Sequence, residues 1–126
     1  MKEAAPRTVL VVDDEPDVVT LVRLLIRDVP DLDVVAEAVD GHEALEMFDQ
    51  LDGPPVPHVV VLDNQMPGMK GIEVARLMRE RVPGQRVVLF TAFVNERVME
   101  EARRAGIDAV LAKTEFKRLV EVLRSI

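Results

Sequence analysis

One stretch decides the fold: Val59-Val60-Val61-Leu62-Asp63-Asn64-Gln65-Met66-Pro67-Gly68-Met69-Lys70-Gly71. Its first four residues are apolar and three of them are β-branched, which is typical of a strand buried on both faces. Asp63 follows directly, and a loop rich in glycine and proline comes next. The stretch predicts a carboxylate at the carboxyl end of a buried strand, where open parallel sheets bind ligands. Alone, Asp63 could equally cap a turn, so the rest of the chain has to decide.

The chain outside this stretch alternates between strand and helix patterns. Short apolar runs predict strands, and apolar residues at helical spacing predict the helices between them. Glu37 interrupts the second run, which favours a strand at the edge of the sheet. Five alternations predict an α/β fold with a doubly wound, five-stranded parallel (βα)5 sheet and helices on both faces. The strands are expected at 8–12, 34–38, 59–62, 86–90 and 109–112.

The predicted helices have a capping residue before them and a helix breaker after them. We expect Glu15 to cap the first helix, Val29 to belong to its apolar stripe, and Thr114 to cap the last helix. A loop is expected at 52–57. The helices are expected from Pro16 to Pro30, from Asp40 (with Glu43 in a capping box) to about Leu51, from Ile72 to Pro83, from Val94 to Ala105 with Gly106 beyond its end, and from Thr114 to Leu123.

Composition limits the class of protein. The 126 residues are 48% hydrophobic, which fits one folded domain at 1–126, with a core at 7–126 and a flexible tail at 1–6. A formal net charge of −7 argues against direct binding of nucleic acid or of a membrane surface by this segment. The chain has no cysteine, and no apolar run reaches membrane-spanning length. We therefore expect a soluble, cytoplasmic protein.

Polar residues follow the predicted strands at one edge of the sheet. Asp13 and Asp14 follow the first strand, Asp63 the third, Thr91 the fourth and Lys113 the fifth. Three carboxylates in one place repel each other unless a cation joins them, and oxygen ligands suit Mg²⁺. A metal, an ammonium and a hydroxyl around one carboxylate could hold a phosphoryl group while that carboxylate attacks it. The cluster predicts phosphoryl chemistry on Asp63.

Five motifs carry a resemblance to a known family. The chain resembles the receiver domain of bacterial two-component response regulators, the CheY-like domain, along nearly its whole length. The resemblance implies a flavodoxin-like strand order of 2-1-3-4-5. The motifs are V-L-V-V-D-D-E-P at 9–16, D-G-x-E-A-L at 40–45, V-V-L-D-x-x-M-P-G-M-x-G at 60–71, T-A at 91–92 and A-G-I-D-A-V-L-A-K at 105–113.

The resemblance also implies a role for each strand-end residue. Asp63 would be the phosphoacceptor, supplied by a sensor histidine kinase, and would become 4-aspartylphosphate. Asp14, Asp63 and the backbone carbonyl of Gln65 would bind Mg²⁺, with Asp13 acting through a water. Lys113 would pair with the phosphoryl group, and Thr91 would turn its hydroxyl towards it. Such a domain is a signalling switch that catalyses only its own phosphorylation and dephosphorylation.

The expected output of the switch is the face made by the fourth helix, the fifth strand and the fifth helix. Through it, the domain would control an output domain or a partner protein, or form a phosphorylation-dependent homodimer. The run from Asp31 to Gly41 resembles receivers that precede a LuxR-type helix-turn-helix, which would make the protein a transcription regulator.

Two positions depart from the family pattern. Val110 stands where receivers usually carry an aromatic switch residue, so the switch should rest on Thr91 and on loop movement. Thr114 follows Lys113 where proline is common, and a trans peptide bond is expected there, because a cis bond without proline costs about 2.5–4 kcal/mol.

Two alternatives belong to other classes of protein. A haloacid-dehalogenase-like Mg²⁺ phosphatase also uses an aspartate nucleophile at a strand end. It needs a second aspartate two residues later, where this chain has Gln65. A pseudo-receiver that is not phosphorylated, and serves only as an interaction module, is disfavoured because all the expected site residues are present. His42 and His58 are interpreted as surface residues.

Overall fold

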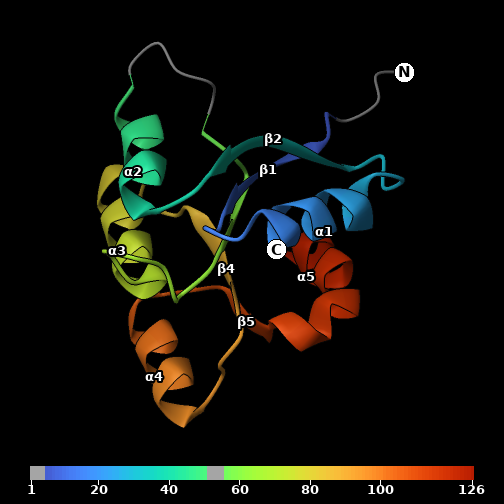
Figure 1. The fold of residues 1–126 in the computed structure, drawn as a ribbon. Helices are drawn as coiled ribbons and strands as arrows, with labels where there is room; N and C mark the ends of the chain where they lie inside the picture. The colour runs from blue at the N-terminus through green and yellow to red at the C-terminus, as the bar shows by residue number, and fades with distance from the viewer. Residues whose placement is uncertain (1–4, 51–55) are drawn as a thin grey trace.

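The computed structural model describes residues 5–50 and 56–126, and its strands and helices alternate as predicted (Figure 1). The α/β class and the (βα)5 pattern are therefore confirmed. The elements are β1 (Arg7–Val12), α1 (Pro16–Ile26), β2 (Leu32–Ala38), α2 (Gly41–Asp49), β3 (Val59–Leu62), α3 (Gly71–Arg81), β4 (Arg86–Thr91), α4 (Glu96–Arg104), β5 (Ala109–Ala112), the 3₁₀ helix η1 (Lys113–Arg118) and α5 (Leu119–Ser125).

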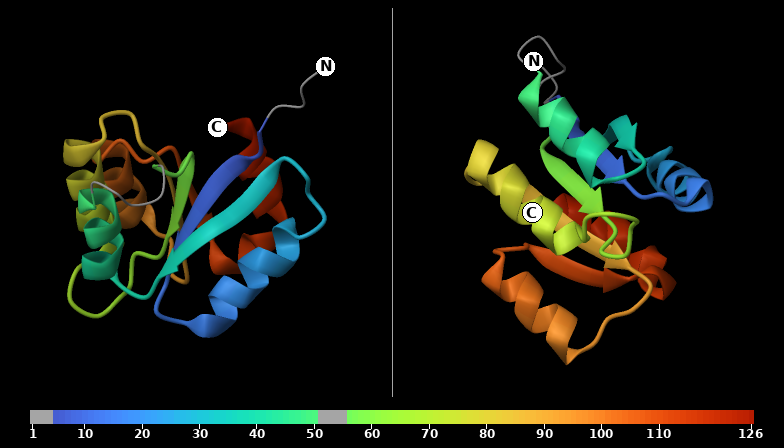
Figure 2. Two further views of the ribbon diagram at one scale, coloured as in Figure 1. Left: turned by 90° about the horizontal axis from the view of Figure 1, so that it is seen from above. Right: turned by 60° about the vertical axis from the view of Figure 1, so that its left-hand side comes forward.

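The five strands form one parallel sheet in the order β2-β1-β3-β4-β5, which confirms the expected order and the edge position of β2. In the β1–β3 register Val12 lies beside Leu62, so the two strands end together. Two helices, α1 and α5, cover one face, and α2, α3 and α4 lie on the other (Figures 1 and 2). The three central strands are thereby buried on both sides, which explains their uninterrupted apolar runs.

The core consists of two apolar clusters, one on each face of the sheet. Because successive strand residues point to opposite faces, alternate residues of β1 enter different clusters. Leu10 and Val12 pack with Val74 and Met78 of α3, while Val9 and Val11 pack in the cluster of α1 and α5. Packing in each cluster fixes the position of its helices along the strand direction. The loops that connect strands to helices are thereby placed at the carboxyl ends of the strands.

The first helix is shorter than the sequence suggested. It ends at Ile26 and not near Pro30, so the expectation that Val29 belongs to its stripe is wrong. Val29 lies in a turn, where its N–H donates to the Ile26 carbonyl at 3.0 Å. A residue before proline avoids the helical region, so Pro30 disfavours a helix that continues through Val29. The side chain of Val29 is still half-buried in the α1–α5 cluster.

Helix caps agree with the sequence at some ends and not at others. Asp40 Oδ1 accepts from the Glu43 N–H at 2.9 Å, as predicted, and Gly106 follows α4 with a φ of 73°. Asn95, which was not predicted, caps α4 through the Val98 N–H at 2.9 Å. Three expectations fall wholly or partly outside the described residues: the end of α2 at Leu51, residues 1–4 of the tail expected at 1–6, and residues 52–55 of the loop expected at 52–57.

Two other predicted caps are wrong. Glu15 occupies the position before α1, but its side chain makes no capping bond there. Thr114 lies inside η1, and the Glu115 carboxylate instead accepts from the Ala112 N–H at 3.1 Å. The bond between Lys113 and Thr114 is trans, as expected, since the described residues contain no cis peptide.

None of the helices in the described parts of the chain has the length and apolar character needed to cross a membrane.

Candidate functional site

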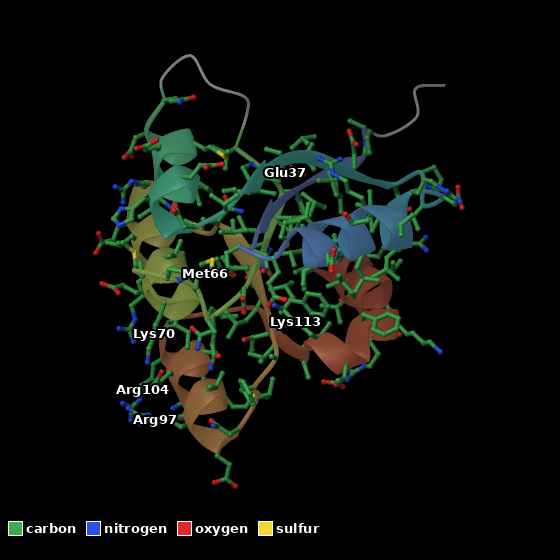
Figure 3. The ribbon with its side chains drawn as sticks, in the orientation of Figure 1. Glu37, Met66, Lys70, Arg97, Arg104 and Lys113 are labelled. Carbon is green, nitrogen blue, oxygen red and sulfur yellow. The ribbon has the colours of Figure 1, made fainter. Side chains whose placement is uncertain are left out.

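The sheet brings the predicted strand-end residues to one edge. The backbone N–H of Asp13 donates to the Ala38 carbonyl, and that of Asp63 donates to the Val12 carbonyl, both at 3.0 Å. These bonds extend the strand pairing by one residue, so both carboxylates leave the sheet at fixed positions. Lys113 begins η1 directly after β5, and Figure 3 shows it beside the strand ends.

Lys113 is the centre of the site because its ammonium group contacts three carboxylates. Nζ lies 3.0 Å from Asp13 Oδ2, 3.2 Å from Glu15 Oε1 and 3.3 Å from Asp63 Oδ2. Asp13 and Asp63 are almost completely buried, with 3% and 2% of their surface exposed. Buried carboxylates need such pairing, because an isolated charge is very costly away from water.

The second oxygens of the two buried aspartates are also engaged. Asp13 Oδ1 accepts from the Glu15 N–H at 2.9 Å, and Asp63 Oδ1 accepts from the Gln65 N–H at 3.2 Å. Each carboxylate therefore bridges the ammonium group and the backbone of the loop that follows its own strand. This arrangement fixes the orientation of both side chains.

Two groups of the site have shifted pKa values. Burial raises the pKa of Asp13, and it outweighs the lowering effects of the Glu15 N–H and of Lys113. Burial also lowers the pKa of Lys113, but the carboxylates of Asp13, Asp63 and Glu15 together raise it above its ordinary value. Lys113 is thus held as an ammonium ion, while Asp13 carries its charge at a cost.

Four carboxylates form a cluster that a cation could join. Asp13, Asp14, Glu15 and Asp63 each offer an oxygen, and these atoms all lie within 4.8 Å of one another. An all-oxygen donor set with exposed members suits Mg²⁺, which retains several waters. Sequence reasoning placed three of these acids in the site but assigned Glu15 to helix capping. The signal that could have placed Glu15 in the acidic cluster was its position directly after the Asp13-Asp14 pair.

The loop from β3 to α3 is fixed to the backbone of the site by two residues that were not predicted. Asn64 is buried, and its Oδ1 accepts from the Ile72 N–H at 3.1 Å, taking the place of a side-chain cap on α3. The Gly71 N–H donates to the Asn64 carbonyl at 3.1 Å. The amino end of α3 is therefore attached to the residue that follows Asp63.

Thr91 ends β4 and is fully buried. Its hydroxyl oxygen has no hydrogen-bond partner within the described protein atoms. A buried hydroxyl without a hydrogen-bond partner raises the free energy of the folded state. A hydrogen bond to a new acceptor would stabilise it. Val110, the other expected switch residue, lies half-buried in β5 and packs against the cluster of α2 and α3.

Comparison with known proteins gives the family to which this fold and its acidic site belong. A family model described as "Response regulator receiver domain" matches residues 9–124. The chain belongs to this family, as the motifs suggested. Its class is a signalling module of two-component systems and not that of a conventional enzyme.

Individual relatives support the same family. The chain is 36% identical over 113 residues to the nitrate/nitrite response regulator protein NarL of Escherichia coli, covering 90% of this chain and 50% of NarL. It is 30% identical over 115 residues to the chemotaxis protein CheY of Listeria monocytogenes, covering 90% of this chain and 92% of CheY. It thus spans half the length of NarL and nearly all of CheY.

A solved structure shows the same likeness. A two-component response regulator of the LuxR family from Aurantimonas superimposes with a TM-score of 0.86 at 30% identity, covering 95% of this chain and 84% of that one. The expected likeness to receivers of the LuxR group is thereby confirmed.

Proposed function

We propose that this domain accepts one phosphoryl group on Asp63 from a phosphohistidine of a sensor histidine kinase. An Asp63 oxygen attacks the phosphorus, the O–P bond forms, and the P–N bond breaks with its electron pair left on the imidazole. The single observation that carries the proposal is the buried Asp63 carboxylate, held 3.3 Å from the Lys113 ammonium within the acidic cluster.

The other residues of the site support the transfer by charge and position. Lys113 would pair with a phosphoryl oxygen and offset the charge that the phosphoryl group brings. Asp14, Asp63 and the Gln65 backbone carbonyl would hold Mg²⁺, with Asp13 acting through a water. When bound, Mg²⁺ supplies charge neutralisation to the phosphoryl oxygens. These roles fit the donor atoms that surround Asp63.

The proposed output is the face of α4, β5 and α5. Thr91 and Lys113 are the residues that would contact the phosphoryl group, and they adjoin the loop into α4 and the end of β5. Arg97 and Arg104 lie on the outer side of α4, away from the sheet (Figure 3). Their ion pairs are with Glu101 and Glu100, within the same helix, so this surface offers mixed charge to a partner.

The likeness to NarL and to the LuxR family suggests a wider setting. We infer a cytoplasmic receiver domain at 1–126, with its core at 7–126, that acts on an output domain or partner protein or forms a phosphorylation-dependent homodimer. In that setting it would regulate transcription through another domain, because the negative charge of this segment does not favour nucleic acid.

The transfer is tested by incubating the protein with acetyl phosphate and Mg²⁺ and measuring its intact mass. We expect one phosphoryl adduct, which disappears in Asp63→Asn and on chelation of the metal. An adduct that persists in Asp63→Asn would refute the assignment. Sustained hydrolysis of p-nitrophenyl phosphate would instead support the phosphatase alternative.

The output face is tested by backbone amide shifts with and without beryllofluoride. We expect changes to concentrate in residues 91–113, and Thr91→Ala to bind beryllofluoride but lose most of these changes. Changes confined to α1 and α2 would show that another face responds.

A further inference from the structure

Glu15 is the one carboxylate on Lys113 to which the proposed function gives no role. The ammonium group of Lys113 already contacts three carboxylates, at 3.0, 3.2 and 3.3 Å from Nζ, and it donates hydrogen bonds to those of Glu15 and Asp63. A phosphoryl group on Asp63 needs at least one N–H of the same ammonium group. A phosphoryl oxygen that pairs with Lys113 therefore competes with the carboxylates that already contact its ammonium group.

The three contacts differ in how easily they are given up. Asp13 and Asp63 are buried, and their second oxygens are bound to backbone N–H groups. The Glu15 side chain is 62% exposed, and its carboxylate makes no other hydrogen bond or ion pair within the described residues. Water can replace Lys113 as the partner of Glu15 at little cost, whereas the buried Asp13 carboxylate would lose its compensating charge.

The position of Glu15 makes this contact specific. Glu15 directly precedes α1 and its backbone N–H is held by Asp13 Oδ1, so its side chain starts from a fixed point beside the site. The side chain does not cap α1 but reaches across to Lys113, 98 residues away in sequence. Glu15 therefore stands where a capping residue would stand, but its side chain contacts the site.

We propose that Glu15 is a positioning residue that holds Lys113 in the unphosphorylated state and competes with the phosphoryl group for it. This inference rests on the proposed phosphorylation of Asp63 and adds a residue that sets its rate. The transfer itself is unchanged: with acetyl phosphate, the bond from Asp63 oxygen to phosphorus forms, the P–O bond to the acetyl group breaks, and acetate leaves. Glu15 takes no part in bond making and only releases one N–H of Lys113.

The test separates the contact from the charge of Glu15. Glu15→Gln removes the charge, while Glu15→Asp keeps it on a side chain one methylene shorter, which should lengthen and weaken the 3.2 Å contact with Lys113. Asp17→Asn is the matched control, because it removes a charge from the same turn at an exposed residue with no contact to Lys113 in the described structure. Adduct formation from acetyl phosphate is followed by intact mass, with Mg²⁺ saturating for each variant.

We expect Glu15→Gln and Glu15→Asp each to speed adduct formation by about two- to fivefold, the range of an exposed ion pair, and Asp17→Asn to match the wild type. In the metal-free, unphosphorylated protein, both Glu15 variants should shift the Lys113 side-chain NMR signals, and urea unfolding should change little. The second readout does not depend on phosphorylation, and a purely structural role would not produce this pattern.

Each other outcome overturns the inference in a distinguishable way. Wild-type rates in Glu15→Asp, with faster rates in both Glu15→Gln and Asp17→Asn, would show a general effect of charge. Unchanged rates or unchanged Lys113 signals in both Glu15 variants, with a normal adduct on Asp63, would remove the role of Glu15 alone. Absence of any wild-type adduct would refute the proposed function and this inference together.

Discussion

Gly71 lies against the backbone of Asp63 so closely that a Cβ atom at position 71 would be 2.1 Å from the Asp63 carbonyl oxygen. No side chain fits at that distance, and the neighbour is backbone, which cannot move aside alone. Because Gly71 is the first residue of α3, the helix start is packed directly onto the residue proposed to receive the phosphoryl group.

Gly71→Ala should therefore affect stability and the site together. We expect a loss of about 1–3 kcal/mol in the free energy of unfolding, measured with urea, because the clash forces the backbone apart. Mg²⁺ binding should weaken in the same variant, since the backbone of Asp63 shifts. The control is Gly84→Ala, where φ is 87° but nothing lies within 4 Å of the added Cβ. Gly84→Ala should lose stability through backbone strain alone and keep its Mg²⁺ affinity.

Thr91→Val should stabilise the unphosphorylated protein. The Thr91 hydroxyl is buried without a partner among the described atoms, so its removal should raise the free energy of unfolding by about 1 kcal/mol. Thr8→Val is a matched control, because the Thr8 hydroxyl accepts from the His58 N–H at 3.0 Å, and its loss should destabilise. Equal effects of the two substitutions in urea unfolding would contradict this interpretation.

Asp14→Ala should reduce Mg²⁺ binding more than Asp13→Ala. Asp14 is exposed and makes no ion pair or hydrogen bond in the part of the chain that the structure describes, so its oxygens are available to a metal. Asp13 already has both oxygens engaged, by Lys113 and by the Glu15 N–H. Titration with Mg²⁺, followed by amide shifts, measures both affinities. A greater loss in Asp13→Ala would reverse the proposed roles of the two residues.

Asp13→Asn should stabilise the metal-free protein near neutral pH. The pKa of Asp13 is raised chiefly by burial, so its ionisation is less favourable in the folded state than in the unfolded one, where the pKa is about 3.9. Wild-type stability should therefore fall, relative to the variant, as the pH rises from that value through the higher pKa of the folded state. The difference should vanish in acid, where Asp13 is protonated in both states.

The same pair of proteins should respond differently to metal. With chelator at pH 7, Asp13→Asn should have the higher melting temperature. Saturating Mg²⁺ should stabilise the wild type more, because binding to the folded state adds to its stability and the variant has lost part of the site. A wild type that is more stable than the variant in chelator at pH 7 would show that the ion pair with Lys113 outweighs the cost of burial.

The sequence alone determined the strands and the edge of the sheet at which the strand-end residues meet. Buried parallel strands need long apolar runs, so the runs ending at Val12, Leu62 and Phe90 were visible without a structure. Because parallel strands end at one edge, the residues after these runs had to meet there. The five predicted strand-end residues depend only on this rule and on the family motifs.

The tertiary structure decided the contacts that local pattern cannot specify. Glu15 directly precedes a helix that begins with proline, yet its carboxylate pairs with Lys113, because the residues that follow β1 and β5 meet beyond the carboxyl edge of the sheet. In the sequence Gly71 has the pattern of an ordinary loop glycine, and only the fold brings it against the backbone of Asp63. Both contacts depend on how two loops far apart in the chain are placed by the packed sheet, and local sequence preferences carry no information about that distance.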